Sequence, residues 1–238
     1  MKKLHLYFIF LSLLSLCFVS CEDENISNTD FFKDQRDGQI YNTVQIGEQT
    51  WMAENLKYLP NVVDPGIGSD SIPFYYVYGY NGANVTDAKA TLNFKTYGVL
   101  YNWPAAMNGE ASSSNIPSGV KGVCPNGWHM PSDEEWNLLI NYLGGSIVAG
   151  AKLKETGTTH WYSNNSEVTN ETGFTALPGG FRGENGMYGN LGSDGIWWST
   201  TESSPDFAST QFMQNNYNDV VRLNFNKEMG FSVRCVKD

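Results

Sequence analysis

The chain has few basic residues. It carries 15 Lys and Arg against 25 Asp and Glu, which gives a formal net charge of −10 over 238 residues. No basic patch is present that would neutralise a phosphate backbone, which argues against nucleic acid as a partner. Charged residues make up only 17% of the chain, and 24 residues are glycine. This composition argues against a helical bundle and favours short strands joined by loops.

Motifs for catalysis and for metal or cofactor binding are missing as well. The sequence contains no GxSxG, P-loop or dinucleotide-binding pattern, and no CxxC pair. Beyond residue 20 the only histidines are His129 and His160, and they lack HxH or HExxH spacing. We therefore expect no metal site, no cofactor and no catalytic residue. His129, beside Trp128, is interpreted as a packing or hydrogen-bonding residue.

The long hydrophobic run of the chain lies at its N-terminus. Lys2 and Lys3 precede an apolar stretch over residues 4–19, which is too short to predict a spanning helix. Phe18-Val19-Ser20-Cys21 then resembles a lipobox, in which Cys21 carries the acyl chains, palmitate among them, and becomes the new N-terminus. We expect a lipoprotein signal peptide over residues 1–20. An ordinary cleaved signal peptide and an uncleaved anchor are the alternatives.

The segment after Cys21 is acidic. Glu22-Asp23-Glu24-Asn25 resembles the tag that directs some Gram-negative lipoproteins to the outer face of the outer membrane, although a solvated tether explains the same acids. Residues 21–36 lack the apolar periodicity to fold alone, so we expect an acidic tether there. The expected location is the cell envelope, as a surface-exposed outer-membrane lipoprotein whose lipid anchor makes the membrane its partner.

Two cysteines remain for the folded part of the chain, Cys124 and Cys235. Outside the cytoplasm, two such residues predict one disulfide rather than a metal site. Closing a loop of roughly 110 residues would lower the entropy of the unfolded chain and so raise the free energy of unfolding by about 4–5 kcal/mol in the entropy model.

Residues 37–238 show no internal domain boundary and no long repeat. A β-hairpin is expected over 39–56, because apolar residues alternate with polar ones on either side of Gly47-Glu48. A helix is expected after Pro131, with Ser132 as N-cap and Glu135 completing a capping box. Short strands are expected over 174–182, 195–201, 208–214, 220–225 and 231–236.

Several sequence blocks follow one another in a fixed order: Asp37–Tyr41 with Val44–Leu56, Tyr97–Trp103, Cys124–Trp136, Leu177–Arg182, Trp197–Glu202 and Gly230–Lys237. Together they resemble the Fibrobacter succinogenes major paralogous domain family over about residues 37–238. This family is abundant among lipidated or secreted bacterial proteins and has no general assigned reaction.

A more distant similarity is to the C-type lectin-like fold and the related formylglycine-generating-enzyme fold. It implies an α+β fold with a small mixed sheet of short strands, about two helices and long irregular loops. It also implies a Cys124–Cys235 bridge as the outer disulfide. The calcium signature of sugar-binding lectins and the paired copper-binding cysteines of the oxidases are absent, which argues against both activities.

Trp197-Trp198 marks the candidate ligand site. Neighbours in a strand point to opposite faces, so one indole can enter the core while the other offers a stacking surface to a sugar ring. Burial of both indoles is the favoured alternative. The polar residues expected to join this low-affinity site are Arg182, Asn185, Asn190, Asp194 and Glu202.

Three classes of function fit these features. A non-catalytic binding module for a glycan or a surface protein explains the anchor, the fold and the aromatic loops. A structural envelope protein without a soluble ligand is the alternative. A surface hydrolase or oxidase fits less well, because it would need an acid pair or a metal; Glu184, Asp194 and Glu202 are explained more simply by loop solvation.

Overall fold

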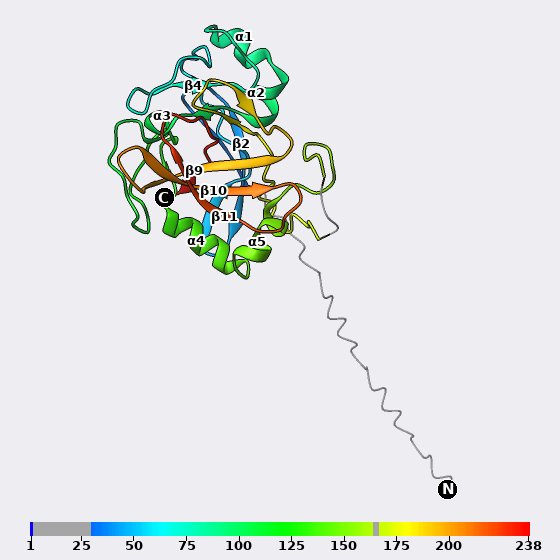
Figure 1. Cartoon of the computed structure of the whole chain (residues 1–238). Coiled ribbons are helices and arrows are strands. Elements are labelled where there is room, and N and C mark those ends of the chain that lie inside the picture. Colours follow the sequence, from blue (N-terminus) through cyan, green and yellow to red (C-terminus); the bar gives the residue numbers. More distant parts are fainter. Residues whose placement is uncertain (2–29, 164–166) are drawn as a thin grey trace.

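The computed structural model describes residue 1 and residues 30–163 and 167–238 (Figure 1). The predicted signal peptide and residues 21–29 of the predicted tether lie outside the described residues. Within the described part, no helix has the length and apolar character needed to cross a membrane.

The largest sheet brings the two ends of the described domain together. Its strand order is β1 (Asp30–Lys33), β2 (Ile40–Ile46), β3 (Gln49–Met52), β12 (Val236–Lys237) and β6 (Trp128–His129), and every neighbouring pair is antiparallel. The expected hairpin is confirmed as β2 and β3. The C-terminal strand β12 lies between β3 and β6, so segments far apart in sequence share one sheet.

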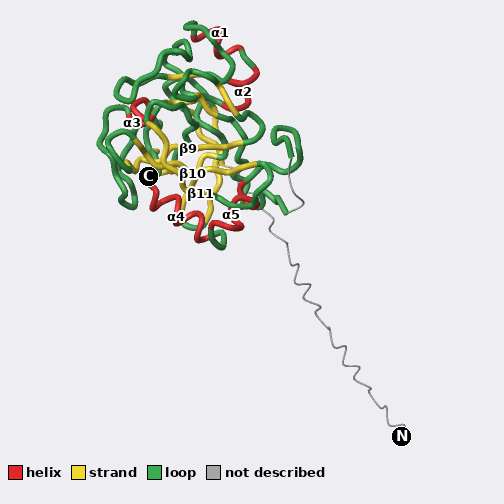
Figure 2. The backbone as a smooth tube through the Cα atoms, in the orientation of Figure 1, coloured by secondary structure: helices red, strands yellow, loops and turns green. Residues whose placement is uncertain are grey.

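The remaining strands form three smaller sheets. One has the order β11-β10-β9 and consists of β9 (Asp194–Glu202), β10 (Phe207–Gln214) and β11 (Val221–Asn226). The other two are pairs: β4 (Tyr75–Tyr76) with β5 (Leu100–Tyr101), and β7 (Phe181–Arg182) with β8 (Tyr188–Gly189). Long loops join these short strands (Figure 2). The α+β class with short strands is confirmed.

The helix expected after Pro131 is α4 (Asp133–Tyr142). The Ser132 side chain accepts a hydrogen bond from the backbone of Glu135, and the Glu135 side chain accepts one from the backbone of Ser132, which completes the capping box. One apolar face of α4, including Trp136 and Leu139, is buried.

Five helices occur among the described residues, more than the two expected. Two of these, α1 (Val85–Ala90) and α2 (Leu92–Tyr97), each bury one residue and give no periodic apolar pattern. They begin instead at side-chain caps, Asn84 and Thr91. The other two are α3 (Trp103–Met107) and α5 (Ser146–Leu153).

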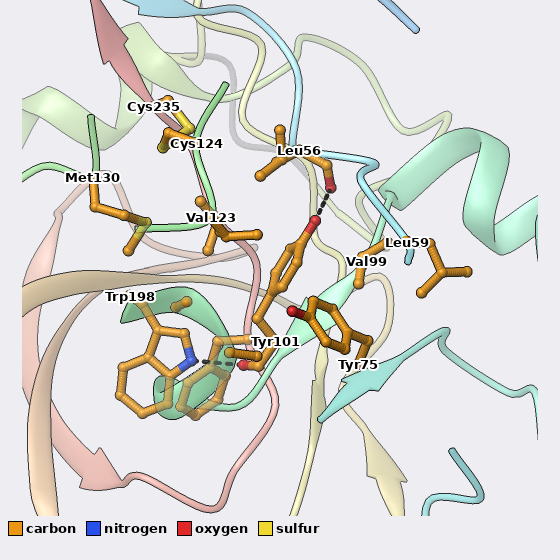
Figure 3. Packing of buried hydrophobic residues seen from close by; sticks show 14 of the residues in the cluster. Leu56, Leu59, Tyr75, Val99, Tyr101, Val123, Cys124, Met130, Trp198 and Cys235 are labelled. Carbon is orange, nitrogen blue, oxygen red and sulfur yellow. Dashed lines mark hydrogen bonds between the residues drawn. A yellow bond between two sulfur atoms is a disulfide. The ribbon is translucent and has the colours of Figure 1, made fainter. Parts of the chain in front are cut away.

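The core consists of two apolar clusters. Figure 3 shows the first, where the Trp198 indole nitrogen donates to the Tyr101 carbonyl oxygen at 2.8 Å and the Tyr101 hydroxyl points to Leu56. The second cluster includes Trp51 and Trp136, whose ring centroids are 4.6 Å apart. The Cys124–Cys235 disulfide is present in the first cluster, as the cysteine count predicted.

The domain begins before residue 37, which corrects the expected tether. Asp30–Lys33 forms β1 and pairs with β2. The buried Asp34 carboxylate binds the Arg36 guanidinium at 2.7 Å, and Arg36 also donates to the Val123 carbonyl oxygen at 2.8 Å. Residues 30–36 are therefore part of the fold. The sequence of residues 30–36 does not reveal this, because few of these residues are apolar. Their partners come from strand β2 and from the loop at Val123.

Buried cations hold the irregular loops in place. Arg234 is fully buried and donates to the carbonyl oxygens of Phe174 and Thr175 and to Asn55 Oδ1. Burial lowers the pKa of Arg234 to about 9, so it remains charged at neutral pH. Lys154 likewise donates to the carbonyl oxygens of Gln214, Asn215 and Tyr217. Each cation thus satisfies backbone carbonyl oxygens, which lie in loops except for that of Gln214 at the end of β10.

Candidate functional site

The tryptophan pair does not form an exposed surface. Trp197 and Trp198 are both 0% exposed. Their side chains do point to opposite faces of β9, but each face is covered by a different cluster. The Trp197 indole nitrogen donates to Asn55 Oδ1 at 2.9 Å, and that of Trp198 to the Tyr101 carbonyl oxygen. The expectation that one indole faces outward is therefore wrong.

The charged residues expected beside the tryptophans are also engaged inside the fold. Arg182 is fully buried, and its Nε and Nη2 atoms donate to the Pro65 carbonyl oxygen at 2.8 and 2.6 Å. Asp194 is buried and accepts a hydrogen bond from Asn190 Nδ2 at 2.6 Å. Arg182 and Asp194 thus hold loops in place through hydrogen bonds, and neither presents its charge to a ligand.

The three remaining polar residues of the predicted site, Asn185, Asn190 and Glu202, are exposed. Asn185 shapes its hairpin by accepting from the Met187 backbone, and Glu202 binds Lys227 at 2.8 Å. Without an indole between them, they do not form the stacking site that the sequence suggested. The predicted ligand surface over residues 181–202 is therefore withdrawn.

A cavity of about 620 Å³ lies elsewhere, against one face of the largest sheet. Strands β3, β12 and β6, the first turns of α4 and the loop around residues 116–121 form its walls. The lining residues are Glu48, Gln49, Ile116, Pro117, Gly119, Lys121, Asn126, Gly127, Trp128, His129, Glu135, Leu138, Val236, Lys237 and Asp238. This volume lies within the usual range for small-ligand pockets.

His129 lies in the wall of the cavity, between two carboxylates. Its Nε2 atom is 2.7 Å from Glu135 Oε1, and its Nδ1 atom is 2.8 Å from Asp238 Oδ1. Glu135 is buried, and its second oxygen accepts from the backbone nitrogens of Ser118 and Ser132. The same carboxylate therefore caps α4 and orients the imidazole.

The two carboxylates favour the charged form of His129. Burial lowers the pKa of His129, but the hydrogen bonds and charges of Glu135 and Asp238 outweigh it, so the pKa lies above its usual value. With both ring nitrogens bonded to carboxylates, the imidazolium donates on both sides. The cavity wall thus holds an imidazole ring fixed between two carboxylates.

The pH dependence of stability is expected to report this charge. Because the pKa of His129 is raised on folding, its contribution is fully present below about pH 6.5, the unfolded value, and is lost as the pH rises through the folded value. Urea unfolding from about pH 5 to about pH 9 should show this loss in the wild type, and His129→Gln should flatten the curve. Equal slopes in the two proteins would contradict the assignment.

The rest of the cavity wall is aliphatic and polar. Ile116 and Leu138 are exposed and supply its apolar part. Trp128 is only 5% exposed and stacks on Phe32, with the ring centroids 4.6 Å apart, so its face is not available to a ligand. The exposed charges at the cavity are of both signs, from Glu48, Lys121, Lys237 and Asp238.

Sequence reasoning identified His129 as a hydrogen-bonding residue but missed the cavity. His129 and Glu135 are six residues apart in the Trp-His-x-Pro-Ser-x-x-Glu block, and this spacing is the signal that could have linked them. Asp238 is distant in sequence and reaches His129 only because β12 pairs with β6. Among the described residues, no group of three or more His, Cys, Asp or Glu side chains could hold a metal ion.

The fold and site together define a loop-rich α+β domain with one internal disulfide and a cavity whose wall holds a histidine between two carboxylates. The family model of the Fibrobacter succinogenes major domain matches residues 44–237, and the chain belongs to this family. The searches of curated proteins and of solved structures each gave no match. The expected likeness to the C-type lectin-like fold therefore stays a prediction.

Proposed function

We propose that the protein is a lipid-anchored, non-catalytic binding module of the cell surface, in the outer membrane, and that its ligand occupies the cavity beside His129. The cavity itself is the observation that carries this proposal. It combines an aliphatic wall with a small number of oriented polar groups, the usual composition of a ligand pocket.

The chemistry of the wall favours a protein ligand over a glycan. Sugar rings bind best on an exposed aromatic face, and the one aromatic residue that lines the cavity, Trp128, is covered by Phe32. A peptide segment fits better, with an apolar side chain between Ile116 and Leu138. Its own charged groups would meet the charges of both signs at the mouth.

The state of His129 supports binding rather than proton transfer. A general base needs a free ring nitrogen within reach of the proton it removes. In His129 both nitrogens are hydrogen-bonded to carboxylates. The residue therefore holds the carboxylates of Glu135 and Asp238 in place at the cavity wall.

Leu138→Ala is expected to weaken peptide binding about tenfold, because roughly 1.4 kcal/mol of apolar contact is lost. The full-length protein in detergent is screened against a peptide library and a glycan array, and affinities are then measured by calorimetry. Leu92→Ala is the matched control, because Leu92 is also an exposed helical leucine and lies outside the cavity.

Unchanged peptide affinity in Leu138→Ala would show that the cavity is not the site. Binding to glycans alone would overturn the ligand class, and binding to neither would favour a structural envelope protein.

A further inference from the structure

Large apolar side chains are exposed where α4 ends and α5 begins. These are Tyr142 on α4 and Ile147 and Val148 on α5, and Ile147 is 79% exposed. The two helices lie side by side at one end of the molecule (Figure 1). We call this three-residue surface the α4–α5 corner. Exposed apolar groups gathered at one corner indicate a contact with another surface.

The sequence stretch that forms the corner carries no charged residue. Residues 138–151 contain no Asp, Glu, Lys or Arg, in a chain with 25 acidic residues. A negatively charged surface would repel an anionic membrane, whereas this stretch presents only apolar and neutral polar groups. It therefore suits the boundary between lipid headgroups and acyl chains, where apolar side chains are buried to a shallow depth.

Strand β1 begins opposite the middle of β2. Asp30 pairs with Thr43, and β1 then runs towards Ile40, away from the turn that follows Ile46. The Tyr142 ring covers that turn so closely that a Cβ on Gly47 would lie 3.0 Å from it. Of the residues of β1, Asp30 thus lies nearest to the turn that Tyr142 covers.

The stretch between Cys21 and Asp30 limits how far the domain can lie from the anchor. Eight residues separate Cys21 from Asp30, and such a segment spans at most roughly 30 Å when fully extended. We propose that the α4–α5 corner rests on the membrane that holds the lipid anchor, with Ile147 and Val148 inserted at its interface. This inference rests on the proposed attachment of lipid to Cys21.

A fluorophore at the corner tests this contact. Ile147→Cys and Leu92→Cys are each labelled with an environment-sensitive dye in the full-length lipidated protein, which is reconstituted in vesicles of phosphatidylethanolamine and phosphatidylglycerol. The two sites are matched, because both side chains are 79% exposed, and Figure 1 places α2, which carries Leu92, at the end opposite α4 and α5. Tyr142→Cys provides a second reporter if Ile147→Cys fails to fold.

We expect the dye at residue 147 to shift its emission to the blue and to lose at least half its intensity when quencher-bearing lipids are added. The dye at residue 92 should show neither change. Equal responses at the two sites, with acyl chains found on Cys21 by mass spectrometry, overturn the docking and leave the anchor intact. Absence of acyl chains on Cys21 overturns both the anchor and the docking.

Discussion

Breaking the Cys124–Cys235 disulfide is expected to lower the free energy of unfolding by about 4–5 kcal/mol. The bridge joins residues 111 positions apart, so it constrains nearly half of the chain in the unfolded state. It also fastens the segment that leads into β12, a strand of only two residues. A strand this short makes few ladder hydrogen bonds, and the covalent link holds it between β3 and β6.

The measurement is urea unfolding of the oxidised and the reduced wild-type protein. This comparison changes the cross-link and keeps both side chains, whereas Cys124→Ala with Cys235→Ala also removes packing atoms from the first cluster. The double variant should therefore be at least as unstable as the reduced protein. Equal midpoints for oxidised and reduced protein, or free thiol at both positions in protein from the cell envelope, would refute the prediction.

Local patterns predicted the elements whose determinants are close in sequence. The hairpin of β2 and β3 follows from alternation around Gly47, and α4 follows from the capping box at Ser132 and Glu135. The disulfide follows from the expected location outside the cytoplasm and from the two cysteines that remain in the folded part of the chain. In each case the residues that decide the structure lie within one short segment, or only one pairing was possible.

The features that sequence reasoning missed depend on distant partners. Strand β1 forms because it pairs with the edge of β2. The residues of β1 themselves show little apolar pattern. Helix α5 contains Gly150, where a Cβ would lie 2.5 Å from the Asp219 carbonyl oxygen, so this helix is defined by close packing rather than by periodicity. The cavity at His129 likewise exists only once β12 brings Asp238 beside β6.

The tryptophan pair shows the limit of strand alternation. The pattern correctly placed Trp197 and Trp198 on opposite faces of one strand. It could not show that both faces are covered, because the cover on each side comes from elsewhere in the chain: Trp51, Trp136 and Phe174 lie in the cluster with Trp197, and Tyr101 and Phe231 in the cluster with Trp198.

Trp197→Ala and Trp198→Ala are therefore both expected to destabilise the protein, each by about 3–5 kcal/mol. Each change removes a fully buried indole and leaves a cavity. Each also removes the hydrogen bond that the indole nitrogen donates, to Asn55 Oδ1 or to the Tyr101 carbonyl oxygen.

Thermal and urea unfolding of the two variants measure this loss. Tyr217→Ala serves as the control, because its aromatic ring is exposed and its removal should change stability by less than about 0.5 kcal/mol. Trp197→Phe and Trp198→Phe keep most of the buried volume and should recover part of the loss. If one alanine variant were as stable as the Tyr217→Ala control, that indole would lie outside the core. An exposed indole on β9 could then serve as a stacking surface for a ligand.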